Sequence, residues 1–220
     1  MLKAKIALLA LPALFALAAC EDPAKDAPKA TVSSAAPKLA TNAPLPAGAE
    51  TLALDPTSTV GFVGSKVTGK HEGKFEKVSG SVSLVGGKIE GGRIAVEVEV
   101  ASVKTDQGDL DKHLQTGDFF DAQKFPKATF TSSEIKGGGN PNAANDKGAT
   151  HTVTGELELH GEKKTVSFPA TITVTADAVT GTAEFAINRK DFKIVYPGKP
   201  DDLIRDDVVL KLSLKAPRKH

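Results

Sequence analysis

The chain has 220 residues and an almost balanced charge, with 28 lysines and arginines against 27 aspartates and glutamates. That balance excludes the strongly basic surface that is typical of nucleic-acid-binding proteins. The sequence has no tryptophan and is rich in threonine, valine and glycine, which favours strands over helices. Its single cysteine, Cys20, excludes an internal disulfide.

The N-terminus predicts export from the cytoplasm. Lys3 and Lys5 precede an apolar run over residues 6–17, and small residues follow it as far as Cys20. This is the pattern of a secretory signal peptide, and the run is too short to span a membrane. We therefore interpret residues 1–19 as a signal peptide.

Residues 20–50 have no apolar periodicity and consist mainly of alanine, proline, lysine, threonine and serine. Such a composition cannot bury enough apolar surface to order the chain, so we expect a disordered tether. A coil of roughly 30 residues has a mean reach of about 30 Å. The tether would hold a single folded domain, residues 51–217, clear of a membrane surface.

Alternation of apolar and polar residues predicts about eight strands in this domain. The clearest covers residues 93–103, where branched side chains alternate with Glu97 and Glu99. The other strands are expected at 59–67, 75–85, 127–135, 152–160, 165–175, 179–188 and 208–215. One short helix is expected at 106–115, a kink or bulge at Gly69, His71 and Gly73, and a strand edge or bulge at Pro169.

Short turns between alternating strands are typical of an antiparallel barrel or a sandwich. We predict an all-β, eight-stranded antiparallel barrel with its one helix in a loop. The inward-facing residues have almost no polar atoms, so the lumen is filled either by the protein's own side chains or by an apolar ligand. Segment 113–130 contains Phe119, Phe120 and Phe125, and we expect these rings to close one end of the barrel.

Five segments of the domain resemble the YceI-like family. They are residues 64–73, His113-Leu114 with 117–120, residues 125–130, residues 153–157 with His160-Gly161 and Lys164, and residues 189–192. The resemblance implies a lipocalin-like barrel in the bacterial envelope whose lumen holds a polyisoprenoid or another long-chain amphiphile, without catalysis. Leu110 and Lys193 stand where many members have arginine and glycine, so the identity of the ligand does not carry over.

Residues 17–20, Leu-Ala-Ala-Cys, resemble the lipobox of bacterial lipoproteins. The resemblance implies a diacylglyceryl group on the Cys20 thiol and cleavage before it, which would anchor the protein to a membrane on its periplasmic side. Glu21 differs from the aspartate that retains enteric lipoproteins in the inner membrane, which favours the outer membrane. The alternative is an ordinary secreted protein that is cleaved near Ala19.

The ligand-binding residues that we expect lie in the lumen or at its mouth. They are apolar and aromatic side chains with two histidines: Phe62, His71, Val96, Val98, His113, Phe119, Phe120, Phe130, Phe168, Phe185, Ile187 and Phe192. The apolar members would make a packed core equally well, and the histidines would equally well form structural hydrogen bonds. No spacing of ligands supports a metal site, so we predict none.

The charges in loop 189–207 have two interpretations. Arg189 is expected to pair with Asp191, or with Asp206 and Asp207, in an ion pair that organises the loop, and a surface pair of this kind contributes little stability. The lysines of the same loop would otherwise meet an anionic headgroup; they are Lys190, Lys193 and Lys199.

Two further functions stay open. An interaction or stress-related envelope protein would have a filled barrel and use loops 137–148 and 189–207. An enzyme would act on isoprenoid-like substrates through His71 or His113, but the sequence has no catalytic or nucleotide-binding fingerprint and indicates no cofactor. We therefore predict a binding protein rather than an enzyme, and we leave a homodimer open.

Overall fold

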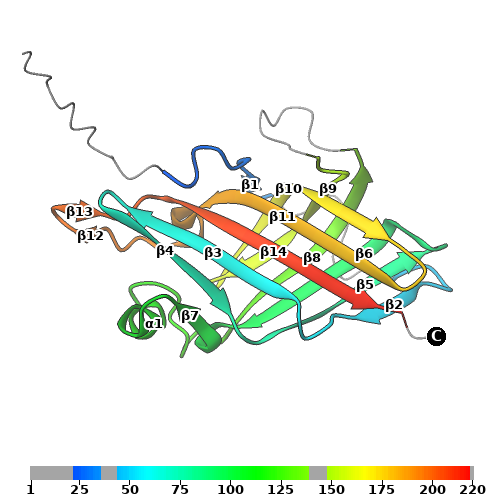
Figure 1. Cartoon of the computed structure of the whole chain (residues 1–220), viewed down its shortest axis with the longest axis horizontal. Coiled ribbons are helices and arrows are strands. Elements are labelled where there is room, and N and C mark those ends of the chain that lie inside the picture. The colour runs from blue at the N-terminus through cyan, green and yellow to red at the C-terminus, as the bar shows by residue number, and fades with distance from the viewer. Residues whose placement is uncertain (1–21, 36–43, 139–147, 219–220) are drawn as a thin grey trace, which may run out of the picture.

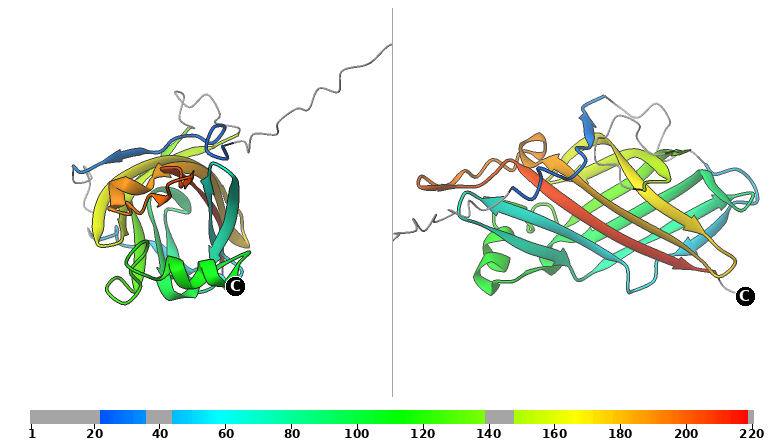
Figure 2. Two further views of the ribbon diagram at one scale, coloured as in Figure 1. Left: turned by 90° about the vertical axis from the view of Figure 1, so that its left-hand side faces the viewer. Right: turned by 45° about the horizontal axis from the view of Figure 1, so that its top comes forward.

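Antiparallel strands form nearly all of the regular structure. The computed structural model describes residues 22–35, 44–138 and 148–218. In this part of the chain the main sheet has 12 strands, and its named strands pair antiparallel throughout. The sheet curls around one long axis, so one face points inward and the other outward (Figures 1 and 2).

Nine long strands make most of the curled wall. They are β3 (Thr59–Lys66), β4 (Gly69–Phe75), β5 (Val78–Val85), β6 (Lys88–Glu99), β8 (Lys127–Gly137), β9 (His151–Leu159), β10 (Glu162–Val174), β11 (Ala178–Asn188) and β14 (Asp207–Pro217). The short elements are β1 (Thr31–Ser33), β2 (Glu50–Ala53), η1 (Val100–Ser102), β7 (Val103–Thr105), α1 (Gly108–Leu114) and η2 (Arg189–Phe192). A separate hairpin joins β12 (Gly198–Lys199) to β13 (Asp202–Leu203).

The strands follow the order β2-β5-β6-β8-β9-β10-β11-β14-β3-β4-β7, and β1 pairs with β10 beside this path. Two ends of the molecule are distinguished in Figure 1. The helix end carries α1, the β3–β4 turn and the β12–β13 hairpin. The C-terminal end carries β2 and the last residues of β14.

The all-β class and the short helix are confirmed, but the predicted count of eight strands is too low. A strand lies in each of the eight predicted positions, and the sheet contains four more. The largest addition is β4, where we expected a kink or bulge at Gly69, His71 and Gly73. It pairs with β3 over its whole length.

Glycine at residue 73 is a packing requirement rather than a break in the strand. Gly73 lies opposite Phe62, and a Cβ atom at residue 73 would overlap the Phe62 ring. The ring of Phe62 therefore occupies the space that a side chain on β4 would need. In the sequence this glycine indicates a turn. In the structure it allows an aromatic ring to lie against the neighbouring strand.

The expected tether is wrong for residues 22–35, which we call the N-terminal strap. Its strand β1 pairs with β10, with Thr31 opposite Ser167. Nearer the N-terminus, the Ala186 amide donates a hydrogen bond to the Pro28 carbonyl over 2.8 Å. Ala24 and Ala27 are only 2% and 8% exposed, and they pack against outward-facing side chains of β3, β11 and β14.

A split in the sheet explains why the strap is ordered. Pro169 has no N–H to donate, and β10 pairs with β11 only beyond it, over residues 171–174. Before that point the two strands diverge, and the strap bonds to both of them. Ala30 and Val32 pack against the main core through this split. The predicted strand edge at Pro169 thus provides the unpaired backbone groups that bind the strap.

The predicted domain, residues 51–217, begins within β2 and ends at the last residue of β14. The predicted signal peptide, residues 1–19, and the predicted lipid anchor Cys20 lie outside the described residues.

Candidate functional site

An apolar cavity of about 220 Å³ lies inside the curled sheet. Strands β3, β6, β8, β9, β10, β11 and β14 contribute to its lining. Alternation explains the lining, because every second side chain of a strand points to the same face. Leu210, Leu212 and Leu214 enter the cavity from β14, while Ala183 and Phe185 enter it from β11.

Most of the predicted ligand-binding residues meet in this cavity. Nine of the twelve line it: Phe62, Val96, Val98, Phe119, Phe120, Phe130, Phe168, Phe185 and Ile187. They come from strands on opposite sides of the curled sheet and from the segment after α1. The structure therefore brings them together as the alternation predicts.

Side chains leave parts of the cavity unfilled. Phe130 lies between Val96 on β6 and Leu157 on β9, and all three remain only partly buried although they face inward. A Cβ atom at either of two lining glycines, Gly64 and Gly181, would meet no heavy atom within 4 Å. Protein interiors are normally close-packed. These positions therefore mark space that the protein's own side chains do not fill.

Both ends of the sheet are packed by side chains. At the C-terminal end, Leu84 and Ala216 have no exposed surface, and they belong to the largest apolar cluster. At the helix end, Val103, Phe119 and Ile194 are buried in a second cluster. Side chains therefore pack as a core at both ends, and some members of both clusters also line the cavity.

Aromatic rings make two groups along the cavity. Phe168 stacks on Phe185 with ring centroids 4.1 Å apart and planes 11° apart, and Phe130 lies 5.4 Å from Phe168. Nearer the helix end, Phe62, Phe75 and Phe120 form a trio with centroid distances of 5.8–6.1 Å. Ring faces and edges therefore provide a large part of the apolar surface.

The helix end is closed by a ring cluster outside that trio. Phe119 lies 5.0 Å from His113 and 5.4 Å from Tyr196, measured between ring centroids. Phe119 and Phe120 thus lie at one end of the cavity, where we expected them. Phe125 instead packs against His160 and lies over Gly161.

Neither predicted histidine lines the cavity. The Nδ1 atom of His71 lies 2.9 Å from Asp106, and the Nε2 atom of His113 lies 2.9 Å from Asp118. Both rings are thus occupied by a carboxylate at the helix end. This geometry fits the structural alternative, in which the histidines fix the β4 strand and the segment after α1.

Phe192 also differs from its expected place at the cavity mouth. Its side chain has no exposed surface and belongs to the main core cluster, not to the cavity lining. The residue ends η2, and Lys193 after it has a φ angle of 58°. The His160 Nδ1 atom lies 3.1 Å from the Phe192 carbonyl. A tight turn therefore directs this ring into the wall.

Arg189 organises loop 189–207 and pairs with Asp206, one of the predicted partners, but its side chain is buried rather than at the surface. Its guanidinium donates to three carbonyls, of Ile194 at 2.7 Å, Arg205 at 3.1 Å and Ile204 at 3.3 Å. It also lies 3.4 Å from an Asp206 carboxylate oxygen. Burial lowers the pKa of Arg189 from its ordinary value.

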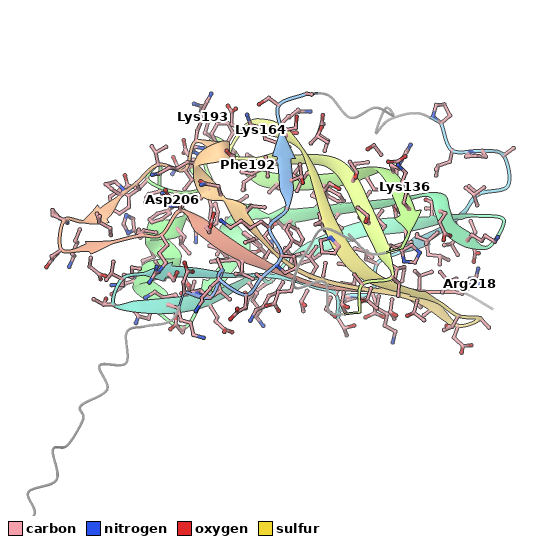
Figure 3. All side chains as sticks on the ribbon, turned by 90° about the horizontal axis from the view of Figure 1, so that it is seen from above. Lys136, Lys164, Phe192, Lys193, Asp206 and Arg218 are labelled. Atoms are coloured by element: carbon pink, nitrogen blue, oxygen red, sulfur yellow. The ribbon has the colours of Figure 1, made fainter. Side chains whose placement is uncertain are left out.

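Two of the loop lysines are engaged by carboxylates. Lys190 lies 2.9 Å from Asp206, and Lys193 lies 2.6 Å from Glu162. The hydrogen bond from Lys193 lowers the pKa of Glu162 below its ordinary value. These pairs compete with any anionic headgroup for the same ammonium groups. Figure 3 shows Phe192, Lys193 and Asp206 together, far from Arg218 at the other end.

Sequence reasoning missed part of the lining. Gly64 and Gly181 have no side chain to place in an apolar pattern, although their positions in the alternation put them on the inner face. Ile194 and Ile204 come from an irregular loop, where no periodicity indicates direction. Alternation therefore identifies wall residues and misses those that loops contribute.

The part of the chain that the structure describes contains no group of three or more His, Cys, Asp or Glu side chains placed to hold a metal ion. Within the same residues, no helix is long and apolar enough to cross a membrane.

Known proteins share this fold and parts of this sequence. A UPF0312 protein of Pseudomonas putida is 31% identical over 142 residues, which are 62% of this chain and 70% of that protein. The corresponding protein of Pseudomonas fluorescens is 32% identical over 145 residues, 63% of this chain and 71% of its own.

Two solved structures of other proteins superpose on most of this chain. BcnA of Burkholderia cenocepacia has a TM-score of 0.62 at 28% identity, covering 74% of this chain and 99% of its own. A polyisoprenoid binding domain of Saccharophagus degradans has a TM-score of 0.59 at 18% identity, covering 76% and 98%, which establishes a shared fold.

The family comparison agrees with both. Residues 53–216, from the last residue of β2 almost to the end of β14, match the YceI-like domain. That span includes every strand that lines the cavity, so the resemblance in the sequence is confirmed and the chain belongs to the YceI-like domain family.

Proposed function

We propose that this protein is an envelope lipoprotein that binds a polyisoprenoid or another long-chain amphiphile in its apolar cavity, without catalysing a reaction. In this proposal Cys20 carries the lipid anchor, the domain faces the periplasm, and the outer membrane is the more suitable location. The ligand would be sequestered or carried rather than converted.

The observation that carries the proposal is the cavity lined by apolar and aromatic side chains. An apolar cavity of this kind stays free of water and binds apolar molecules, because a water inside it would have no hydrogen-bonding partners. The cavity follows the long axis of the sheet, with lining residues from near both ends. This elongated shape suits a chain rather than a compact ligand.

The volume limits how such a ligand is held. About 220 Å³ is below the roughly 300–1,000 Å³ of typical small-molecule pockets. A long chain would therefore fill the cavity with one part and extend beyond it with another, including its polar headgroup. Gly64 and Gly181 leave additional room beside the rings.

The test is native mass spectrometry of the protein purified from its own envelope. We expect an added mass that organic extraction removes and that is identified as an amphiphile with a long apolar chain. The extracted protein should regain the mass when the same compound is added back. A bare polypeptide mass in every envelope preparation would contradict ligand binding.

The anchor has a separate test. The Cys20→Ser variant should lose the mass of the lipid and move from the membrane fraction to the soluble periplasmic fraction. Its domain should keep the melting temperature of the unmodified protein, since Cys20 precedes the strap. Recovery of the variant in the membrane fraction with an unchanged mass would contradict lipidation at this residue.

A further inference from the structure

Exposed large apolar side chains gather at the helix end. Val67, Val195 and Leu203 are 57%, 60% and 50% exposed, and they are the exposed large apolar side chains among the described residues. Val67 lies in the β3–β4 turn, Leu203 in β13, and Val195 in the loop that leads to β12. All three segments lie at the same end in both views of the ribbon (Figures 1 and 2).

Backbone hydrogen bonds join these segments into one rigid tip. The Val67 amide donates to the Leu203 carbonyl over 3.3 Å, and the Arg205 amide donates to the Ser65 carbonyl over 2.8 Å. The hairpin is in turn tied to the preceding loop, because the Ile204 amide donates to the Pro197 carbonyl over 2.9 Å. The three side chains are therefore presented by connected hairpins rather than by separate loops.

One charged pair of this tip is held within the protein, whereas Lys199 and Asp201 of the β12–β13 hairpin are exposed. Lys66 lies 2.6 Å from Asp202, and the Thr68 amide and hydroxyl also donate to the Asp202 carboxylate. The ammonium of Lys66 holds the pKa of Asp202 below its ordinary value. An exposed apolar tip of this kind suits the interfacial region of a bilayer, where apolar side chains are buried beside polar and charged ones.

The first residue of the strap, Asp22, lies at the same end. Asp22 lies 3.5 Å from Arg205, which adjoins the β12–β13 hairpin, and Ala24 is buried against β3 and β14. Cys20 is two residues before Asp22, so covalent geometry limits the separation of their Cα atoms to about 7 Å. An acyl chain on Cys20 would thus enter the membrane beside the tip.

We propose that Val67, Val195 and Leu203 dock the helix end on the bilayer surface that holds the lipidated Cys20. The proposal depends on the lipid anchor for the location of the membrane, but not on the amphiphile in the cavity. It makes the helix end face the lipid, and the C-terminal end face the periplasm. A ligand drawn from the bilayer would then enter at the end closed by Phe119.

The test uses two features of the sequence, its single cysteine and its lack of tryptophan. The chain from residue 20 onward is coupled through Cys20 to a maleimide-headgroup lipid in phosphatidylcholine vesicles that contain brominated lipid. A single tryptophan is introduced by Leu203→Trp at the tip or, as the control, by Lys88→Trp at the C-terminal end. Both residues are exposed, and both proteins have the same anchor.

We expect the brominated lipid to quench the tip tryptophan at least fivefold more than the control tryptophan. Adding Val67→Ser and Val195→Ser to the tip variant should reduce its quenching to the control level at an unchanged melting temperature. Equal quenching at the two positions would overturn the proposal. A blue shift of the tip tryptophan that rises with the number of proteins per vesicle, without quenching by the brominated lipid, would instead indicate contact with a second copy of the chain. That result would also overturn the proposal.

This experiment distinguishes failure of membrane docking from failure of the proposed ligand binding. Amphiphile binding by the same tethered protein is measured with a fluorescent fatty acid. Failure of tip quenching with normal fatty-acid binding removes the docking surface alone. Normal tip quenching without fatty-acid binding removes the proposed ligand alone.

Discussion

Arg189 shows how one buried side chain fixes an irregular loop. Its guanidinium satisfies carbonyls of Ile194, Ile204 and Arg205, which are brought together from both ends of the loop. Two of these residues line the helix end of the cavity. This donor group therefore helps to fix the position of the loop, and with it one end of the cavity.

We expect Arg189→Met to destabilise the domain by at least about 2 kcal/mol, because each buried carbonyl left without a donor costs about 1–3 kcal/mol. Chemical denaturation at neutral pH measures this change. The control is Lys190→Met, which removes the exposed partner of the same Asp206 and should cost less than about 1 kcal/mol. Equal losses in the two variants would contradict the role of Arg189.

Asp111 connects α1 to β7 through a carboxylate with a lowered pKa. Its Oδ1 atom accepts hydrogen bonds from the Thr105 hydroxyl at 2.8 Å and the Thr105 amide at 2.6 Å. The Thr105 hydroxyl is the main cause that lowers the pKa of Asp111 from 3.8, and burial opposes it.

A lowered folded-state pKa means that the ionised form stabilises the fold. The contribution of Asp111 is therefore complete above its unfolded pKa, near 4, and is lost as the pH falls through the lower folded value. We expect Asp111→Asn to lower the melting temperature by a few degrees at pH 7, with a difference that shrinks steadily below pH 4 or so. A difference that stays constant down to the acid limit of folding would contradict this assignment.

At the scale of elements, the strap closes a gap that the sheet cannot close by itself. It supplies a strand to β10 and two hydrogen bonds to Ala186 on β11. It also covers Val63 and Val209 with small side chains. The wall of the cavity is therefore completed by residues from outside the predicted domain.

Deleting residues 22–35 should expose the Ala186 amide, whose acceptor is the Pro28 carbonyl. We expect hydrogen exchange at Ala186 to accelerate at least tenfold. The Phe185 amide is the matched control, because successive residues of a strand direct their N–H groups toward opposite neighbours, here β14. Exchange at Ala186 that does not change on deletion would show that the strap does not protect this strand.

The sequence predicted the strands whose apolar and polar residues alternate, and it missed the segments that are ordered only by contact with other strands. Alternation located eight strands and most of the cavity lining, because wall residues such as Val96 and Phe185 repeat every second position. The strap has no such pattern, and its order comes from the backbone groups that β10 and β11 leave unpaired. Likewise β4 contains glycines and charges, and only the ring of Phe62 explains Gly73.

At the scale of the whole molecule, the cavity has a cost. Side chains that face a cavity lose packing contacts on that side, so a cavity of about 220 Å³ lowers the stability of the fold. An occupant that fills this space would recover part of that stability and would stabilise the folded form by mass action. The proposed ligand would therefore stabilise the fold that binds it.

The central claim is tested most directly by filling the cavity from the inside. The variants Gly64→Leu and Gly181→Leu place a side chain in open space within the lining, and Thr180→Leu places the same side chain on the exposed face of β11. The measurement is the dissociation constant for a fluorescent long-chain fatty acid, with the melting temperature recorded for each variant.

We expect both glycine variants to bind the fatty acid at least tenfold more weakly, at an equal or higher melting temperature, while Thr180→Leu binds as the unmodified protein does. Unchanged binding in folded Gly64→Leu and Gly181→Leu variants would contradict the claim that the ligand occupies the apolar cavity inside the sheet.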